Sequence, residues 1–223
     1  VVFVSPLEDR VEDGGGHARV HLVPERLRGH AGRFRLCVVE RSQPLVDGSH
    51  QVLEHVTSTG VIGRRYPIDR VRAGIAALPP VLTSDDATGP ARGMMTTDTV
   101  AKIAEATIAG SDARVVGMAK GVGMIEPDMA THISVLFTDA ELTSAELDAV
   151  FRRVVDRTFN CVSIDTDTST SDASVIMASG AAGRVDEDAF EAALEAVALD
   201  LTKQIARDGE GAHSLIEVHV DAA

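Results

Sequence analysis

Two long segments with a one-sided apolar stripe constrain the fold most strongly. One runs from a capping box at Thr143–Glu146 to about Thr158, and the other spans Glu187–Ala206 after Asp186, a favoured N-cap residue. The apolar residues that recur at helical spacing are Leu147, Val150, Phe151, Val154 and Val155 in the first segment and Phe190, Leu194, Val197, Leu201 and Ile205 in the second. Such a helix must bury its stripe, so we expect both helices to lie against a sheet.

Short apolar runs alternate with these helices and predict strands. The predicted strands are Val1–Val4, Phe34–Val39, Ala101–Ile108, Arg114–Met118, His132–Thr138, Ala173–Ala178 and Ser214–Val220. A further helix is predicted over Pro67–Leu78, followed by a loop over Pro79–Pro90 that is rich in Pro, Ser, Asp and Gly. This order predicts a layered α/β or α+β fold with helices packed on β-sheets.

The charge and composition exclude several classes of protein. A formal net charge of −13 makes nucleic acid and anionic membranes poor partners, and 3% aromatic residues without Trp leave no stacking platform for single strands. No run approaches the roughly 18 apolar residues of a membrane span. We therefore expect no nucleic-acid partner and no membrane partner.

Cysteine and histidine usage argues against a metal site. Cys37 and Cys161 lie far apart and form no CxxC pair, and the eight histidines include no HExxH pair. The acidic stretch Asp165–Asp172 does not match a calcium-binding loop. Counted from Asp165, the sixth residue is Thr170 where such a loop has Gly, and the twelfth is Ile176 where it has Glu. We expect no metal, a cytoplasmic location, and a hydroxyl-rich loop near the active site at Asp165–Asp172.

The segment Gly117–Thr131 carries the most informative chemistry. It combines Lys120, close-packing glycines, Pro127 and an Ala130-Thr131 junction ahead of a predicted strand. A Thr freed at a chain N-terminus brings its own base, the α-amine, whose ordinary pKa is about 7.7–8.0. Cleavage at the junction would therefore create the nucleophile. Taken alone, an Ala-Thr pair more often just begins a strand, where β-branched residues are favoured.

Five motifs, in order, resemble the ornithine acetyltransferase family, also called bifunctional glutamate N-acetyltransferases. They are Ser58–Gly63, Met95–Thr99, Gly117–Thr131, Ile164–Asp172 and Asp208–Ala212, within a match from about Thr57 to Ala223. In this family the chain breaks before a Thr that then carries the acetyl group. The resemblance implies a self-processing sandwich of helices and sheets, cut between Ala130 and Thr131.

The resemblance also assigns roles to individual residues. Thr131 would be the nucleophile and contact the substrate, and the cleaved bond would join it to Ala130. Thr59 and Gly60 would form the oxyanion hole, and three further residues would bind the substrate: Thr97, Lys120 and Glu210. Independently of the family, the Ser58-Thr59-Gly60 turn can direct a hydroxyl and a backbone N–H at one point, and the Glu210 carboxylate between two glycines suits a cationic amine.

The implied activity is transfer of an acetyl group from N-acetyl-L-ornithine to L-glutamate by a ping-pong scheme, in arginine biosynthesis or related secondary metabolism. No cofactor is implied, although acetyl-CoA is an alternative acetyl donor in some relatives. The cleaved chains of the family associate, so an α2β2 heterotetramer is expected. The implied division is a divergent segment 1–56, the rest of the α chain at 57–130, and a truncated β chain at 131–223.

Two alternatives remain open from the sequence. The first is a related self-cleaving amidohydrolase, in which water replaces glutamate as the acceptor. The second is a catalytically inactive truncated homologue. Relatives continue past the position of Ala223 into a domain with further substrate contacts and a Trp-containing segment, and this chain has no Trp.

Overall fold

The structure of the protein is a computed structural model. The structure describes residues 2–4, 18–22, 35–44, 50–59, 65, 67–77, 86–125, 132–167 and 172–220. In the first four strands it describes the backbone alone, apart from Thr59, which is buried.

A mixed five-stranded sheet forms the centre of the molecule, in the order β1-β8-β7-β6-β5. Its strands are β1 (Val2–Val4), β5 (Lys102–Thr107), β6 (Arg114–Lys120), β7 (Ile133–Glu141) and β8 (Ala173–Arg184). The β7 and β8 strands are parallel, whereas the other neighbours are antiparallel. A parallel pair needs a crossover connection, and the helix α3 supplies it.

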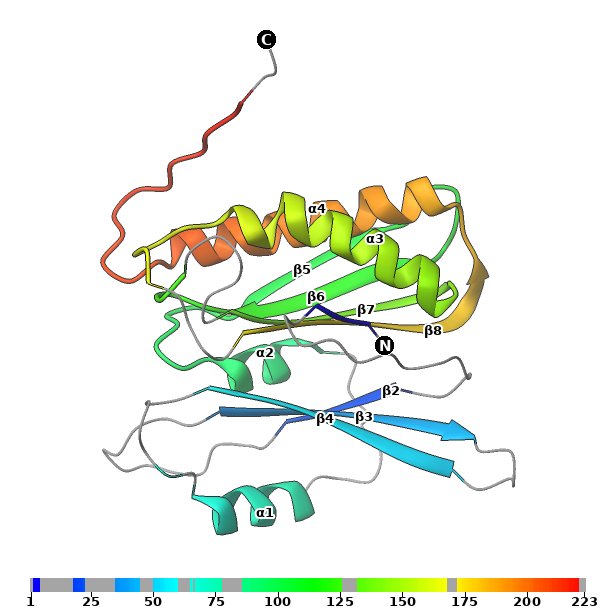
Figure 1. The fold of residues 1–223 in the computed structure, drawn as a ribbon, viewed down its shortest axis with the longest axis horizontal. Helices are drawn as coiled ribbons and strands as arrows, with labels where there is room; N and C mark the ends of the chain where they lie inside the picture. The colour runs from blue at the N-terminus through cyan, green and yellow to red at the C-terminus, as the bar shows by residue number, and fades with distance from the viewer. Residues whose placement is uncertain are drawn as a thin grey trace.

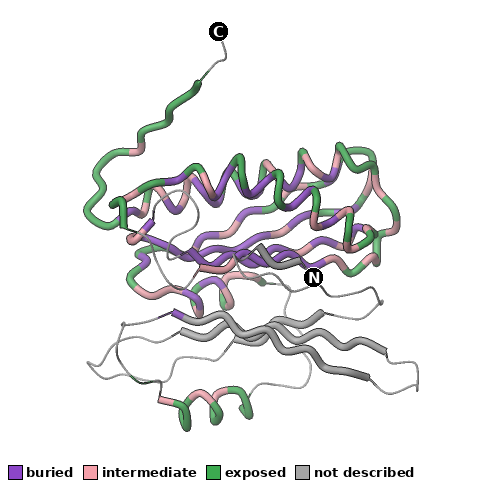
Figure 2. Tube along the Cα trace, viewed as in Figure 1, coloured by how far each residue is buried: buried purple, intermediate pink, exposed green. Residues whose placement is uncertain are grey.

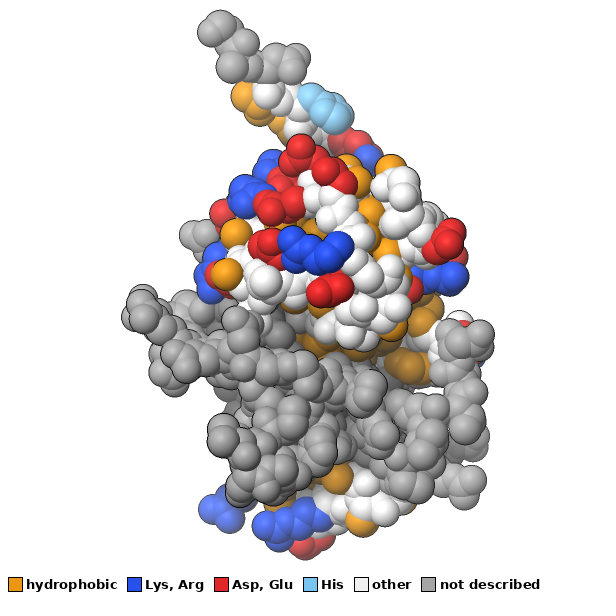
Figure 3. All heavy atoms as spheres, turned by 90° about the vertical axis from the view of Figure 1, so that its right-hand side faces the viewer, with side chains coloured by type: hydrophobic (Ala, Val, Ile, Leu, Met, Phe, Trp, Pro, Cys, Tyr) orange, Lys and Arg blue, Asp and Glu red, His pale blue; other side chains and the backbone are white. Residues whose placement is uncertain are grey.

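The helices α3 (Ser144–Arg157) and α4 (Glu187–Arg207) run side by side over one face of this sheet (Figure 1). The Thr143–Glu146 capping box is present in α3, and Asp186 caps α4. Both apolar stripes predicted from the sequence are buried, and they form the main core with the upper face of the sheet (Figure 2). Exposed ion pairs, such as Arg157 with Glu191, join the outer sides of the two helices, and acidic and basic side chains lie next to one another on the surface of this part of the molecule (Figure 3).

The opposite face of the sheet is covered by α2 (Thr88–Met94) and a second sheet (Figure 1). This second sheet is antiparallel, in the order β2 (Ala18–Leu22), β3 (Arg35–Pro44), β4 (His50–Thr59). The α2 helix contacts β5 and β6 on one side and β2 and β3 on the other. On the far side of the second sheet lies α1 (Ile68–Ala76). The layered α/β prediction is thereby confirmed.

One predicted strand is wrong. Residues Ser214–Val220 alternate as a strand would, but the chain there forms no β-ladder and leads away from the sheets (Figure 1). Ile216, Val218 and Val220 are 82%, 78% and 88% exposed. Alternation gives a strand two distinct faces, but a strand also needs a neighbouring strand, and none of the described residues forms a β-ladder with this segment.

The sequence also missed several elements. The predicted loop Pro79–Pro90 overlaps the start of α2, whose Gly89-Pro90 pair resembles a turn signal, and β2 and β4 were not predicted. A short 3-10 turn, η1 (Phe159–Cys161), follows α3. Among the described residues, no helix combines the length and the apolar composition needed to cross a membrane.

Candidate active site

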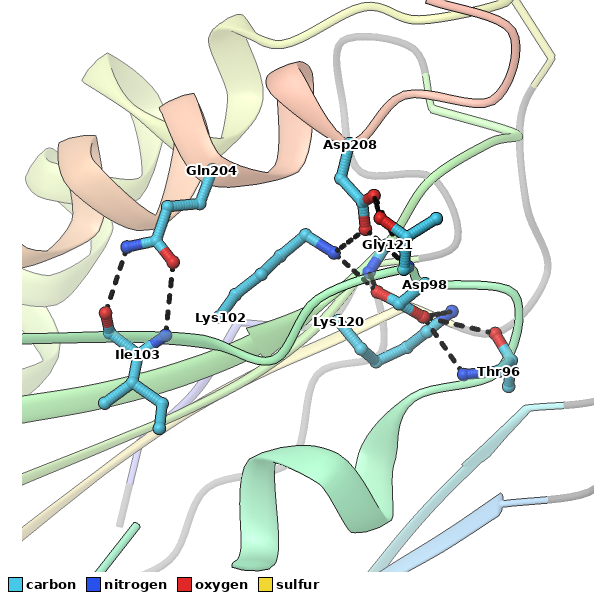
Figure 4. Close-up of polar contacts among 9 residues, drawn as sticks. Thr96, Asp98, Lys102, Ile103, Lys120, Gly121, Gln204 and Asp208 are labelled. Atoms are coloured by element: carbon cyan, nitrogen blue, oxygen red, sulfur yellow. Dashed lines mark hydrogen bonds and ion pairs between the residues drawn. The ribbon is translucent and has the colours of Figure 1, made fainter. Parts of the chain in front are cut away.

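A buried carboxylate, Asp98, connects two buried lysines at one end of the five-stranded sheet (Figure 4). Its Oδ1 accepts hydrogen bonds from Lys102 Nζ at 2.8 Å and from the backbone N–H of Gly121 at 2.7 Å. Its Oδ2 accepts from the N–H of Thr96 at 3.0 Å and lies 3.9 Å from Lys120 Nζ. Asp98 therefore ties the start of β5 to the end of β6.

The two lysines reach Asp98 from opposite faces of the sheet. Strand side chains alternate, so Lys102 shares the helix face with Ala104, whereas Lys120 shares the α2 face with Met118. Lys102 is fully buried and Lys120 is 2% exposed. Two buried ammonium groups require compensating anions, and Asp98 serves both.

A second carboxylate, Asp208 at the C-terminal end of α4, completes the network. Its Oδ2 lies 2.6 Å from Lys102 Nζ and accepts from the N–H of Thr99 at 3.0 Å, while its Oδ1 accepts from the Thr99 hydroxyl. Gln204, one turn earlier, pairs through its amide with both backbone groups of Ile103. The end of α4 is thus fixed to β5 and to the turn before it (Figure 4).

These contacts set the charge state of the network. Burial by itself would raise the pKa of Asp98, but the Lys102 hydrogen bond and the Lys120 charge outweigh it and lower that pKa. Burial lowers the pKa of Lys120, an effect that Asp98 opposes. A lysine with a lowered pKa next to a fixed carboxylate is the kind of group found at functional sites.

A pocket of about 390 Å³ lies beside this network. It is lined by Thr97, Thr99, Val122, Arg207, Asp208, Gly209, Glu210, Gly211 and Ala212. The structure thus brings together Thr97 and Glu210, two predicted substrate contacts that are far apart in the sequence. Because the backbone N–H of Glu210 donates to the carbonyl of Val122 at 2.5 Å, the Gly121–Ile125 loop forms part of this wall.

The Gly121–Ile125 loop also contacts Asp165, at the start of the acidic stretch Asp165–Asp172. Asp165 Oδ1 accepts from the N–H of Ile125 at 2.9 Å, and Oδ2 accepts from Met124 at 2.5 Å. A Cβ built on Gly123 would lie 3.0 Å from Glu210 Oε2 and 3.1 Å from Asp165 Oδ2. Glycine at 123 therefore gives both carboxylates room to approach the loop. Among the described residues, no group of three or more potential ligands is placed to hold a metal ion.

A buried histidine, His132, stands at the start of β7. It is 3% exposed, its ring centroid lies 4.4 Å from that of Phe159, and neither ring nitrogen has a hydrogen-bond partner among the described residues. Burial and the Lys120 charge lower its pKa to about 3, so the ring is neutral at neutral pH. Its backbone N–H donates to Asp172 Oδ1 at 2.7 Å.

The predicted site residues divide into three groups. Thr97 and Glu210 line one pocket, and Lys120 lies in the adjoining charge network. Ser58 and Thr59 are the last two residues of β4 and pair with β3, so they continue a strand instead of forming the predicted turn; Thr59 is 7% exposed. Gly60, Ala130 and Thr131 lie outside the described residues, so the nucleophile, the cleavage junction and the second member of the oxyanion hole stay predictions.

The sequence did not single out the residues that organise the site. Asp98 and Asp208 belong to the motifs Met95–Thr99 and Asp208–Ala212, yet no role followed from them. A usable signal was Lys102, an ammonium group within a predicted apolar strand, since a buried lysine needs a carboxylate. Asp172 and His132 gave no comparable signal.

Comparison with known proteins places this chain in a family. The family model described as the ArgJ family matches residues 38–223, further upstream than the motifs noted above. The arginine biosynthesis bifunctional protein ArgJ 2 of Nostoc sp. is 56% identical over 168 residues, which cover 75% of this chain and 43% of that protein. The glutamate N-acetyltransferase Oat2 of Streptomyces clavuligerus is 54% identical over 168 residues, covering 75% and 42%.

A third relative aligns over a longer stretch. The arginine biosynthesis bifunctional protein ArgJ of Ruegeria pomeroyi is 42% identical over 200 residues, or 87% of this chain and 49% of that protein. The chain thus spans less than half the length of these curated relatives. The match over residues 38–223 and these identities show that the chain belongs to the ArgJ family.

Proposed function

We propose that this chain cleaves its own backbone between Ala130 and Thr131. The cleaved protein then takes part in moving an acetyl group from N-acetyl-L-ornithine to L-glutamate, in arginine biosynthesis or related secondary metabolism. The observation that carries the proposal is the pocket of about 390 Å³ in which Thr97 and Glu210 meet beside the buried Lys120–Asp98 pair. The names of the relatives, a glutamate N-acetyltransferase and bifunctional arginine biosynthesis proteins, support the reaction class.

The proposed cleavage begins with attack of the Thr131 hydroxyl on the carbonyl carbon of Ala130. The C–N bond breaks, the hydroxyl proton passes to the departing nitrogen, and the acyl group moves onto the Thr131 oxygen as an ester. Water then opens the ester and leaves a carboxylate on Ala130. Thr131 gains a free α-amine, which is a base of suitable pKa for its own hydroxyl.

The proposed transfer uses the same hydroxyl twice. The Thr131 hydroxyl attacks the acetyl carbonyl of N-acetylornithine, and the α-amine of Thr131 takes up the hydroxyl proton. The amide C–N bond then breaks, and ornithine leaves with that proton. The α-amine of glutamate then attacks the acetyl-Thr131 ester, which gives N-acetylglutamate and restores the hydroxyl. Each step passes through a tetrahedral oxyanion, and the predicted donors for it are Thr59 and Gly60.

The charges around the pocket suit these substrates. The exposed Glu210 carboxylate offers a partner to the cationic side-chain amine of the donor. Lys120 is a candidate partner for the substrate carboxylate. Its ammonium group lies 3.9 Å from Asp98, within the network whose other carboxylate, Asp208, lines the pocket. Arg207, which also lines the pocket, adds a second cation within reach of an anionic substrate group.

The test is a comparison of the wild-type chain with Thr131→Ala and Thr131→Ser. We expect the wild type to be cut and to form N-acetylglutamate from N-acetylornithine and glutamate, Thr131→Ala to do neither, and Thr131→Ser to do both more slowly. Uncut wild type, or transfer by Thr131→Ala, would overturn the proposal. Acetate release without N-acetylglutamate would instead indicate the amidohydrolase alternative, and acetyl-CoA is tested as donor in the same assay.

Two further parts of the proposal concern the cleaved protein as a whole. We expect the pieces 1–130 and 131–223 to stay associated, because β6 before the cut pairs with β7 after it over Val115–Lys120 and Ile133–Thr138. An α2β2 assembly in the cytoplasm is the proposed form, which size-exclusion chromatography with light scattering tests.

A further inference from the structure

The acidic loop between η1 and β8 contacts the chain on both sides of the proposed cleavage junction. Asp165, near its start, accepts hydrogen bonds from Met124 and Ile125, and Asp172, at its end, accepts one from His132. The six residues between Ile125 and His132 contain the Ala130-Thr131 bond. Two carboxylates of one short loop therefore hold the two flanks of that segment.

The upstream contact holds an unusual backbone. Met124 has φ 54°, the left-handed region that side chains other than glycine rarely adopt. Asp165 Oδ2 accepts the N–H of this residue, and the Ile164 N–H in turn donates to the carbonyl of Ile125 at 2.8 Å. Thr166, directly after Asp165, has φ 62°. The two described non-glycine residues with positive φ thus lie in the two segments that this contact joins.

The downstream contact fixes the backbone directly after the junction, where β7 begins. His132 donates its N–H to Asp172 Oδ1 at 2.7 Å, and its carbonyl accepts from the Ala173 N–H at 3.0 Å. The parallel β7–β8 pairing begins at the next residue, Ile133 with Ala173. His132 is also buried, so this end of the segment is anchored by packing as well as by hydrogen bonds.

We propose that Asp165 and Asp172 are positioning residues for self-cleavage, which hold the flanks of residues 126–131 so that the Thr131 hydroxyl meets the Ala130 carbonyl. This inference rests on the proposed function for the identity of the bond that breaks. Attack of a hydroxyl on the preceding carbonyl needs a bent, fixed peptide, and a misplacement of 1 Å can cost about 10²-fold in rate. Asp165 and Asp172 fix the backbone of the described residues on either side of this peptide.

The environment of Asp172 gives the inference a pH signature. Burial raises its pKa to about 6, opposed by the His132 N–H and by Lys120 on β6. The ionised carboxylate is the stronger acceptor for an N–H. Cleavage that depends on this contact is therefore expected to rise as the pH passes through about 6, whereas a variant without an ionisable group at 172 loses that rise.

The kinetic test follows the newly synthesised full-length chain in a cell-free system, with the uncut and cut forms separated by mass. We expect Asp165→Ala and Asp172→Ala to slow cleavage about 10- to 100-fold. Asp172→Asn, which keeps an acceptor oxygen, is expected to cleave faster than Asp172→Ala but without the rise near pH 6. The control is Asp167→Ala, an exposed carboxylate of the same loop, which is expected to match the wild type. Wild-type rates in both alanine variants would overturn the inference.

A second readout does not need cleavage and separates this inference from the proposed function. In the Thr131→Ala background, amide hydrogen exchange at Met124, Ile125 and His132 is expected to speed up at least ten-fold when Asp165 or Asp172 is replaced by alanine, while α4 stays protected. Unchanged exchange at these amides would contradict the inference even if the wild type is cut. If α4 loses protection, the asparagine variants take the place of the alanine variants.

Discussion

The Asp98 carboxylate lies 2.8 Å from the Lys102 ammonium group, and neither side chain is exposed to solvent. The same carboxylate accepts the Gly121 N–H and lies near Lys120, so one acidic side chain determines the geometry of two strands and a loop. An intact buried ion pair adds little net stability, because the cost of desolvation offsets the attraction, but removing one partner is costly.

Asp98→Ala is expected to lower the free energy of unfolding by about 3–5 kcal/mol, because it leaves Lys102 and Lys120 buried with less compensating charge. The measurement is urea unfolding followed by circular dichroism. The matched control is Asp148→Ala, which removes the exposed pair with Arg152 and should cost about 0–1 kcal/mol. Equal losses in the two variants would show that Asp98 is not the organising charge.

Gly117→Ala is expected to destabilise the protein by about 1–3 kcal/mol, because a Cβ there would meet Leu201 Cδ1 at 2.8 Å and Val197 Cγ1 at 3.0 Å. The β6 strand therefore approaches α4 too closely for any side chain at this position. Gly89→Ala in α2 is the control, since a Cβ there has nothing within 4 Å and alanine favours a helix. Thermal unfolding of both variants checks this, and an unchanged or raised Tm for Gly117→Ala would refute it.

His132→Leu is expected to reduce the sensitivity of the fold to acid. The pKa of His132 falls from 6.5 to about 3 through burial and the Lys120 charge, so between these values the unfolded chain takes up a proton that the folded chain does not. The free energy of unfolding therefore decreases as the pH falls, by up to about 1.4 kcal/mol per pH unit. Urea unfolding at pH 4 to 7 should give a shallower slope for the variant. Equal slopes for the wild type and the variant would mean that His132 is not both buried and neutral in the folded protein.

Glu210→Gln is expected to raise KM for N-acetylornithine about 10- to 100-fold with little change in the fold, because a charge-assisted hydrogen bond contributes about 1.5–3 kcal/mol. The measurement is steady-state transfer to glutamate with varied donor. Glu217→Gln is the control, since Glu217 pairs with Lys203 and is not among the residues that line the pocket. An unchanged KM would remove Glu210 from the substrate site.

The helices and central strands were predictable because their signals are local. The stripes of α3 and α4 repeat at helical spacing, and the caps at Thr143 and Asp186 mark where they begin. The Ser214–Val220 strand was predicted wrongly because pairing is not a local property. The α2 helix was missed because burial of Ala91 and Met94 between two layers outweighs the cost of Gly89.

The site was predictable only in part, for a related reason. Motifs pointed to Thr97, Lys120 and Glu210. The structure brings Thr97 and Glu210 to one pocket, whereas Lys120 is buried beside Asp98 and is not among the residues that line this pocket. The Lys102–Asp98–Lys120 network could not be read from spacing, since its lysines lie on opposite faces of two strands. Only the folded sheet brings both charges to one carboxylate.

The intact mass of the purified protein tests the central claim most directly. We predict two pieces for the wild type, with masses of residues 1–130 and 131–223, and one uncut chain for Thr131→Ala. A wild-type chain that stays whole, or one cut at any other bond, would contradict it.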